Sequence, residues 1–269
     1  MNRQWLLKAR PHGMIGPDNF EYTETPIPQI GDGEILVHNQ YLSFDPTQRN
    51  WMVDRPGYLP PVGMGEVMRA GSVSEVVESK HPDFKPGELV QTTGCWQDFA
   101  VVAPGQGPMG VNKLPPGVSP EMMLSILGIT GMTAYFGLLD HGQPEEGETV
   151  LVSGAAGATG SVVGQIAKLK GCRTIGIAGG EKKCAWLTDV AKFDGAIDYK
   201  SEDVSERIGA LCPNKWDIFF DNVAGPILEA ALNHLNLYSR VVMCGGIANY
   251  NNIEPEPGPN NLMNIVTNR

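Results

Sequence analysis

The stretch Glu148–Lys170 constrains the fold of this 269-residue chain more than any other segment. Thr149–Val152 is a short run of β-branched and apolar residues, long enough for one strand buried in a parallel sheet. Ser153–Gly160 is small and rich in glycine. Apolar residues then recur at helical spacing at Val162, Val163, Ile166, Ala167 and Leu169. The pattern therefore predicts a strand, a glycine turn and a helix, in that order.

The glycine turn fits A-x-G-x-x-G, a variant of the dinucleotide-binding fingerprint, at Ala155, Gly157 and Gly160. Gly157 lets the backbone approach a pyrophosphate, and Gly160 lets the helix pack closely on the strand. The free N–H groups at the helix start then face the phosphates. The alternative is a packing turn in another βα unit. The strand before the turn and the helix after it favour the dinucleotide site.

The end of the next predicted strand, Arg173–Ala178, indicates which dinucleotide. An NAD site carries Asp or Glu there to hold the ribose hydroxyls, whereas this chain has Gly179 and Gly180. Lys182 and Lys183 follow and suit a 2′-phosphate, so NADP is predicted. Two alternatives stay open: the lysines can be an ordinary solvated helix start, and Glu181 can serve the ribose instead.

Composition excludes several classes of function. The net charge of -10 disfavours nucleic acid and anionic membrane surfaces as partners. No run approaches the roughly 18 apolar residues of a membrane span, and the N-terminus lacks the apolar core of a secretory signal. The sequence therefore predicts a globular cytoplasmic protein with no membrane partner.

No metal site is predicted. The five cysteines are scattered, their number is odd, and no two form a C-x-x-C pair, so neither a disulfide framework nor a cysteine-rich zinc site is indicated. The histidines show no metal-ligand spacing and are interpreted as surface or structural residues. They are His12, His38, His81, His141 and His234.

Two domains are predicted, at residues 1–118 and 119–269. Short strand candidates separated by turn residues indicate a small barrel-like β domain in the first. In it, Gly65–Glu78 is predicted as two strands broken at Gly71. After the helix start at Ser119 and Pro120 an apolar helix is predicted through Leu139. Five strands with crossover helices then indicate a doubly wound parallel sheet of the Rossmann type. The strands are expected at Thr149–Val152, Arg173–Ala178, Gly195–Asp198, Trp216–Phe220 and Arg240–Cys244, with a helix around Ile227–Asn236 before the last.

The sequence ends in Asn260–Arg269, which looks like the first turns of a helix. A dinucleotide fold usually has a sixth strand. We therefore expect a further C-terminal segment to be missing, and the strand near Arg240–Cys244 to lie at an uncovered sheet edge.

Six motifs together resemble one protein family. They are Y-L-S-F-D-P at Tyr41–Pro46, Y-L-P-P-V at Tyr58–Val62, G-x-T-A-Y at Gly131–Tyr135, G-A-T-G-S-V-V-G-Q at Gly157–Gln165, D-N-V at Asp221–Val223 and C-G-G-I-A-N-Y-N at Cys244–Asn251. The chain resembles the zinc-independent branch of the medium-chain dehydrogenase/reductases, in particular its NADP-dependent alkenal and enone reductases. The resemblance covers essentially the whole chain and implies a GroES-like β-barrel domain before the Rossmann domain.

The resemblance implies reduction of the carbon–carbon double bond of enones and enals with NADPH, in a homodimer. It assigns the pyrophosphate to Gly157–Gly160 and the 2′-phosphate to Lys183 and Tyr199. It assigns Tyr58 and Tyr250 to the substrate. The nicotinamide half falls to Asn222 and to a loop made of Cys244, Gly245, Gly246, Ile247, Ala248, Asn249 and Tyr250.

Conjugate reduction needs no metal, because a hydroxyl group can stabilise the enolate oxygen that forms when hydride reaches the β-carbon. Tyr58 and Tyr250 are therefore the expected catalytic donors. Tyr58 can also be a packing residue of its loop, Tyr250 a loop anchor and Tyr199 an aromatic at the sheet edge. One departure stands out: many relatives have D-P-Y-M-R where this chain has Asp-Pro-Thr-Gln-Arg at residues 45–49, which removes one pocket tyrosine.

Two other functions stay open. One is a zinc-free NADPH quinone reductase with the same cofactor domain. The other is a cofactor-binding protein without turnover.

Overall fold

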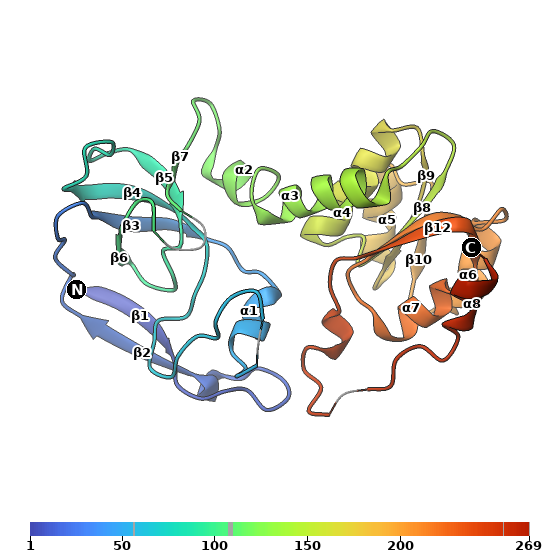
Figure 1. Cartoon of the computed structure of the whole chain (residues 1–269), viewed down its shortest axis with the longest axis horizontal. Helices are drawn as coiled ribbons and strands as arrows, with labels where there is room; N and C mark the ends of the chain where they lie inside the picture. Colours follow the sequence, from blue (N-terminus) through green and yellow to red (C-terminus); the bar gives the residue numbers. More distant parts are fainter. Residues whose placement is uncertain (56, 107–109, 255, 269) are drawn as a thin grey trace. The chain divides into compact units, whose positions relative to one another are not determined.

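The computed structural model describes residues 1–55, 57–106, 110–254 and 256–268 (Figure 1). The chain forms two compact units, Met1–Gly128 and Ile129–Arg269. The helix α2 (Pro120–Leu124) belongs to the first unit, whereas the sequence places it after a boundary at residues 118 and 119. The assignment of these two domains to catalysis and cofactor binding stays a prediction.

The first unit is built from antiparallel strands. The larger sheet has five strands in the order β6-β3-β4-β5-β7, and β1 pairs with β2 in a second sheet. Isolated bridges from Gln4 to Gln97 and from Leu6 to Val67 join β1 to the chain between the larger strands. The strands are β1 (Asn2–Leu7), β2 (Phe20–Thr25), β3 (Ile35–Leu42), β4 (Ser72–Ser79), β5 (Leu89–Thr92), β6 (Phe99–Val102) and β7 (Asn112–Lys113), with a 3-10 helix at Pro17–Asn19.

Alternation of apolar residues builds the core of this unit. Ile35 and Val37 of β3 point inward with Val76 and Val90, as period-two patterning predicts. The expected two strands in Gly65–Glu78 are wrong in part. Only Ser72–Ser79 forms a strand. The preceding residues make an isolated bridge at Val67 and single backbone bonds, such as that from the N–H of Met68 to the carbonyl oxygen of Trp5.

The second unit is a parallel five-stranded sheet in the order β10-β9-β8-β11-β12, which confirms the predicted doubly wound fold. The strand order reverses between β8 and β11, so the topological switch point lies there. β12 is the end strand, as expected for the strand near Arg240–Cys244. The strands are β8 (Thr149–Ser153), β9 (Arg173–Ala178), β10 (Gly195–Asp198), β11 (Trp216–Asp221) and β12 (Leu235–Met243).

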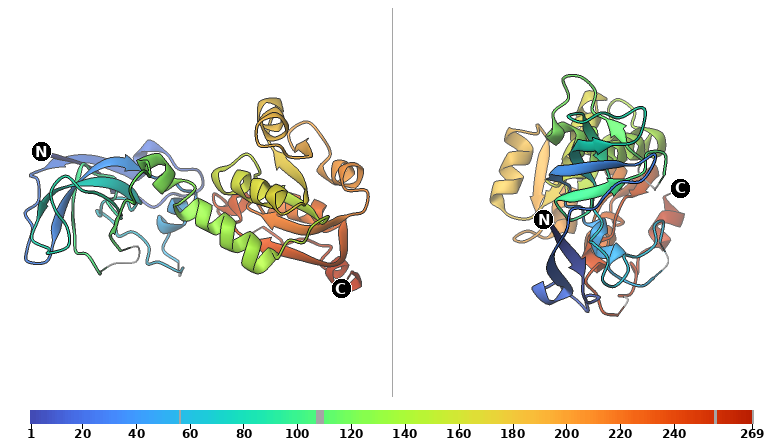
Figure 2. Two further views of the ribbon diagram at one scale, coloured as in Figure 1. Left: turned by 90° about the horizontal axis from the view of Figure 1, so that it is seen from above. Right: turned by 90° about the vertical axis from the view of Figure 1, so that its left-hand side faces the viewer.

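Helices cover both faces of this sheet, as Figures 1 and 2 show, so its central strand β8 is buried throughout. Val163 of α4 and Leu187 of α5 pack on one face, and Ile208 of α6 and Ile227 of α7 pack on the other. The helical segments are α3 (Ile129–Phe136), a π-helix (Gly137–Gly142), α4 (Ala158–Leu169), α5 (Glu181–Asp189), α6 (Val204–Leu211), α7 (Gly225–Ala231), a 3-10 helix (Ile247–Asn249) and α8 (Met263–Thr267).

Two predicted helices have the wrong extent. The single helix expected through Leu139 is interrupted between α2 and α3, where a Cβ atom at Gly128 would lie 2.8 Å from the backbone of Leu124. The helix expected around Ile227–Asn236 stops at Ala231, and β12 begins at Leu235. There the indole Nε1 of Trp216 donates to the carbonyl oxygen of Ala231 at 2.8 Å, and Leu235 pairs with Trp216 in the sheet. Packing onto β11 thus overrides a helical apolar pattern.

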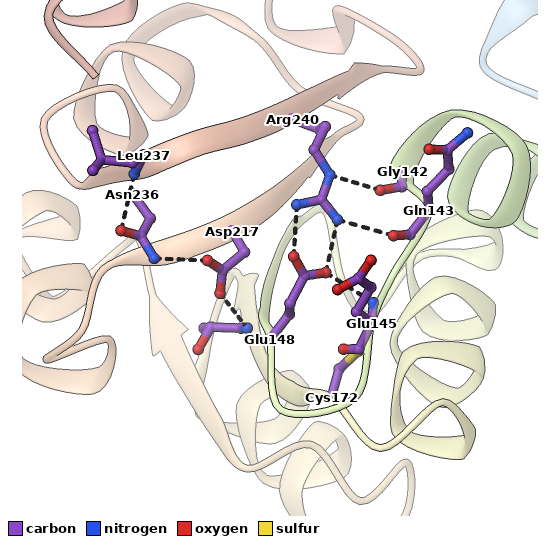
Figure 3. A network of polar contacts seen from close by, with 10 residues as sticks. Gly142, Gln143, Glu145, Glu148, Cys172, Asp217, Asn236, Leu237 and Arg240 are labelled. Carbon is purple, nitrogen blue, oxygen red and sulfur yellow. Dashed lines mark hydrogen bonds and ion pairs between the residues drawn. The ribbon is translucent and has the colours of Figure 1, made fainter. Parts of the chain in front are cut away.

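A polar network ties β12 to the amino end of β8 (Figure 3). Both terminal nitrogens of Arg240 donate to the Glu148 carboxylate at 2.7 Å, and the same guanidinium donates to the carbonyl oxygens of Gly142 and Gln143. Burial by itself would raise the pKa of Glu148, but the hydrogen bonds from Arg240 and from the N–H of Glu145 hold it below its ordinary value. The network lies at the opposite end of β8 from the glycine turn.

Within the described residues, no helix is both long and apolar enough to cross a bilayer.

Candidate functional site

The glycine turn after β8 and the start of α4 form a candidate anion-binding site, the cradle. Gly157 precedes α4, and no side chain of the described residues caps this helix. The N–H groups of Ala158, Thr159 and Gly160 have no partner within the helix, because they belong to its first turn. A Cβ atom at Gly160 would lie 2.5 Å from the carbonyl oxygen of Gly154, so only glycine fits. The cradle therefore has the donors and the helix-dipole field that a pyrophosphate requires.

A second loop, between β9 and α5, carries the residues expected to select the cofactor. The ring of Tyr199 lies over Gly179, where a Cβ atom would come within 2.8 Å of the ring edge. Lys183 is in the first turn of α5 and is exposed. The structure thus brings Tyr199 and the start of α5 to one corner of the sheet.

Asp198 holds this second loop, and sequence reasoning missed it. Its Oδ1 accepts hydrogen bonds from the N–H of Gly180 at 2.7 Å and of Lys200 at 3.0 Å, and its Oδ2 accepts one from the hydroxyl of Ser201. The bond from Gly180 is the main cause that lowers the pKa of Asp198. Because the loop donates to a carboxylate, the glycine pair is fixed beside Tyr199.

The third part of the site is at the carboxyl ends of β8 and β11, at the switch point. The hydroxyl of Ser153 donates to Oδ1 of Asp221 at 2.6 Å and accepts the N–H of Asn222 at 2.8 Å. The side-chain Nδ2 of Asn222 donates to the carbonyl oxygen of Ser153 at 2.7 Å. Asn222, a predicted cofactor residue, is therefore anchored to β8 as well as to its own strand.

The loop after β12 packs on this third part. The N–H groups of Cys244 and Gly245 donate to the carbonyl oxygen of Asp221 at 2.8 and 3.1 Å, and the N–H of Ala248 donates to that of Val223 at 3.1 Å. Desolvation, with the nearby charge of Asp221, raises the pKa of the Cys244 thiol to about 11, so the thiol stays protonated at neutral pH.

The hydroxyl of Tyr250 lies near Gly245, at the start of this loop. A Cβ atom at Gly245 would lie 3.2 Å from the carbonyl oxygen of Asn222 and 3.3 Å from the hydroxyl oxygen of Tyr250. Glycine at 245 therefore lets the tyrosine hydroxyl and the Asn222 backbone approach one another. Asn222, Gly245 and Tyr250 form one cluster in the second unit.

Tyr58, the other predicted donor, belongs to the first unit. Its side chain is 74% exposed, and its hydroxyl hydrogen-bonds the hydroxyl of Thr47 at the start of α1 (Thr47–Trp51). The N–H of Val62 donates to the carbonyl oxygen of Trp51 at 2.8 Å, which ties the tyrosine loop to this helix. Thr47 was singled out in the sequence only as a missing tyrosine, and its contact with Tyr58 was not predicted.

Among the residues that the structure describes, no three His, Cys, Asp or Glu side chains are grouped so that they could hold a metal ion.

Comparison with known proteins places both units in families of oxidoreductases. Residues 3–111 match the family described as the N-terminal domain of oxidoreductase, and residues 158–267 match the family described as zinc-binding dehydrogenase.

The relatives include NADP-dependent reductases. The chain is 44% identical to the NADPH-dependent curcumin reductase of Escherichia coli over 261 residues, which cover 97% of this chain and 75% of that protein. It is 36% identical to the NADP⁺-dependent 2-alkenal reductase of Nicotiana tabacum, with 100% of this chain and 78% of that protein covered. Among solved structures, CurA from Vibrio vulnificus in complex with NADPH is 44% identical, with a TM-score of 0.89 over 98% of this chain and 77% of that one.

Proposed function

Because the chain belongs to the medium-chain dehydrogenase/reductase family, in the branch of NADP-dependent alkenal and enone reductases, we propose that it reduces the carbon–carbon double bond of α,β-unsaturated ketones and aldehydes with NADPH. One structural observation carries the proposal. The open start of α4 follows β8, and the Asn222 loop follows the neighbouring strand β11, so both meet at the switch point where such sheets bind dinucleotides. NADPH, when bound, supplies the hydride.

The residues around this point divide the cofactor among them. The turn Gly157–Gly160 holds the pyrophosphate through the N–H groups of Ala158, Thr159 and Gly160, because the N–H of Gly157 already donates to the carbonyl oxygen of Gly154 at 2.9 Å. Lys183 with Tyr199 binds the 2′-phosphate by charge and hydrogen bonding. The nicotinamide half is held by Asn222 and by the loop Cys244, Gly245, Gly246, Ile247, Ala248, Asn249 and Tyr250. The start of α4 supports this assignment, because its first N–H groups are the donors that a phosphate needs.

The two tyrosines serve the substrate. Negative charge develops on the carbonyl oxygen as an enolate, and a preorganised hydroxyl donor there stabilises the transition state. Tyr58 and Tyr250 provide these hydroxyls, and no metal is required for the step. The exposure of Tyr58 and its hydrogen bond to Thr47 support the role, because the hydroxyl is both accessible and oriented.

We further propose that the protein is a homodimer and is cytoplasmic. The resemblance to the family supports the dimer. The five cysteines are free in the structure, which supports the cytoplasm, where thiols stay reduced. Size-exclusion chromatography with light scattering measures the oligomeric state. Fractionation of cells that express the natural gene measures the location.

Turnover of a matched panel tests the proposed activity. NADPH consumption is measured with an enone, an enal and a quinone, and the enone product is identified by mass spectrometry and NMR. We expect a saturated ketone from the enone, with the carbonyl intact. Faster reduction of the quinone without any saturated ketone would favour the quinone reductase, and NADPH binding without consumption by any of the three would favour a binding protein.

A further inference from the structure

A buried pair, Ser153 and Asp221, lies at the switch point, between the end of β8 and the turn that follows β11. Both side chains are 0% exposed. The two residues end the adjacent parallel strands β8 and β11, whose register runs from Val150 opposite Ile218 to Val152 opposite Phe220. Ser153 and Asp221 occupy the next position of this register, so their side chains meet.

One carboxylate oxygen of Asp221 accepts three hydrogen bonds. Oδ1 of Asp221 accepts the hydroxyl of Ser153 at 2.6 Å and the N–H groups of Val223 and Ala224 at 2.9 and 3.0 Å. Ala224 has φ 62°, a left-handed conformation that an alanine rarely adopts. The bonds to Asp221 therefore stabilise a turn that its own backbone preference opposes.

The other carboxylate oxygen of Asp221 reduces the stability of the fold. Oδ2 of Asp221 is buried and has no hydrogen-bond partner among the described residues. A buried acceptor without a partner reduces stability, so such groups are uncommon in folded proteins. If Asp221 only stabilised the turn, a side chain without a second buried acceptor would do so at a lower cost in stability.

The pair also controls the second loop, through the backbone. The carbonyl oxygen of Asp221 accepts the N–H groups of residues 244 and 245. That of Asn222 accepts the N–H of residue 247, and that of Val223 accepts the N–H of residue 248. Any shift of the turn at 221–224 is therefore transmitted to the loop that ends at Tyr250. The adenine side of the site, at Gly179 and Tyr199, instead depends on Asp198 and shares none of these bonds.

We propose that Ser153 and Asp221 are positioning residues for the nicotinamide half of the cofactor, acting through Asn222 and the loop after β12. The inference rests on the proposed function, since it assumes that NADPH binds at the switch point. It separates the site into two independently held parts: the Ser153–Asp221 pair holds the nicotinamide loops, and Asp198 holds the 2′-phosphate loop.

A comparison of two ligands tests this separation. The dissociation constants of NADPH and of adenosine 2′,5′-bisphosphate, which lacks the nicotinamide half, are measured by calorimetry for the unchanged protein and for Ser153→Ala. Loss of a buried hydrogen bond to a charged group should weaken NADPH about 10-fold or more. The bisphosphate should bind within about twofold of the unchanged protein, because its own contacts are intact.

Thr149→Val is the matched control. It changes a buried residue at the other end of the same strand, and we expect both ligands to bind as before. Asp221→Ala removes the acceptor shared by the turn and should weaken NADPH more than Ser153→Ala does. If this variant does not fold, Ser153→Ala decides alone, because it removes a single oxygen atom.

Equal loss of both ligands in Ser153→Ala would show a general structural role and overturn the inference, as would unchanged NADPH binding. Failure of the unchanged protein to bind NADPH would instead overturn the proposed function, and this is seen before any variant is compared.

Discussion

The hydroxyl groups of Thr47 and Tyr58 hydrogen-bond to one another in the first unit. Thr47 starts the helix α1, whose last turn is anchored by the buried side chains of Trp51 and Met52. Tyr58 lies in the loop that returns to this helix at Val62. Thr47 therefore lies on a helix that is anchored in the core of the first unit, and it can orient a tyrosine that is otherwise exposed.

Removing the threonine hydroxyl should reduce enone turnover only when Tyr58 is present. We expect Thr47→Val to lower kcat about 5- to 10-fold, the effect of one net hydrogen bond, and Thr47→Ser to retain most of the activity. In a Tyr58→Phe background the Thr47→Val change should have little further effect. An undiminished effect of Thr47→Val in that background would show that the threonine acts independently of the tyrosine.

The two tyrosine hydroxyls should share the stabilisation of the enolate oxygen. Loss of a single preorganised donor can cost roughly 100- to 1000-fold in turnover, and a shared role makes each single loss smaller. Tyr58→Phe and Tyr250→Phe should each lower kcat on an enone, and the double variant should be slower than either. NADPH affinity should change less in Tyr58→Phe than in Tyr250→Phe. Parental turnover by the double variant would remove both residues from the carbonyl site.

Lys183 should select NADPH over NADH. Loss of a charge-assisted contact to phosphate costs on the order of 1.5–3 kcal/mol, so Lys183→Ala should weaken NADPH about 10- to 100-fold and hardly affect NADH. Lys170→Ala, at the far end of α4, is the matched loss of one exposed positive charge and should change neither affinity. Equal weakening of both cofactors by Lys183→Ala would contradict the 2′-phosphate assignment.

The pair of Glu148 and Arg240 should stabilise the second unit in a pH-dependent way. Glu148 has its pKa lowered in the folded chain, so its contribution is present above the unfolded pKa of about 4.3 and is lost as the pH falls through the folded value. Glu148→Gln should cost about 1–2 kcal/mol at pH 7 and much less below pH 4. Urea unfolding at several pH values measures this. A cost that stays constant with pH would show that the carboxylate charge is not responsible.

Enone reduction should survive exhaustive chelation, because the proposed step uses hydroxyl donors and no metal ligand. Activity is compared before and after dialysis against a chelator, with zinc measured by atomic absorption. Stoichiometric zinc that is lost together with activity, and that restores activity when added back, would overturn the metal-free proposal.

Local sequence patterns determined the architecture of the second unit. The strand, glycine turn and helix at Glu148–Lys170 appear in the structure as β8, the cradle and α4. Strand and helix are set largely by the spacing of apolar residues. Gly160 marks a backbone approach that no other residue permits, so the close packing of α4 on the turn could also be predicted from the sequence.

Element ends were less predictable, since they depend on contacts far away in the chain. Leu235 continues a helical apolar pattern, yet pairing with Trp216 makes it the first residue of β12. Tertiary packing decides such cases, because local preferences amount to less than about 1 kcal/mol for each residue.

The sequence by itself thus determined the fold class and the glycine turn, and it predicted a preference for a 2′-phosphate. All three depend on residues close together in the chain. Only the tertiary structure showed the groups that hold these parts in place. Ser153 meets Asp221 across 68 residues, and Asp198 reaches Gly180 across 18. A serine or an aspartate has no distinctive local pattern, and its role appears only when adjacent parallel strands bring their carboxyl ends together at one edge of the sheet.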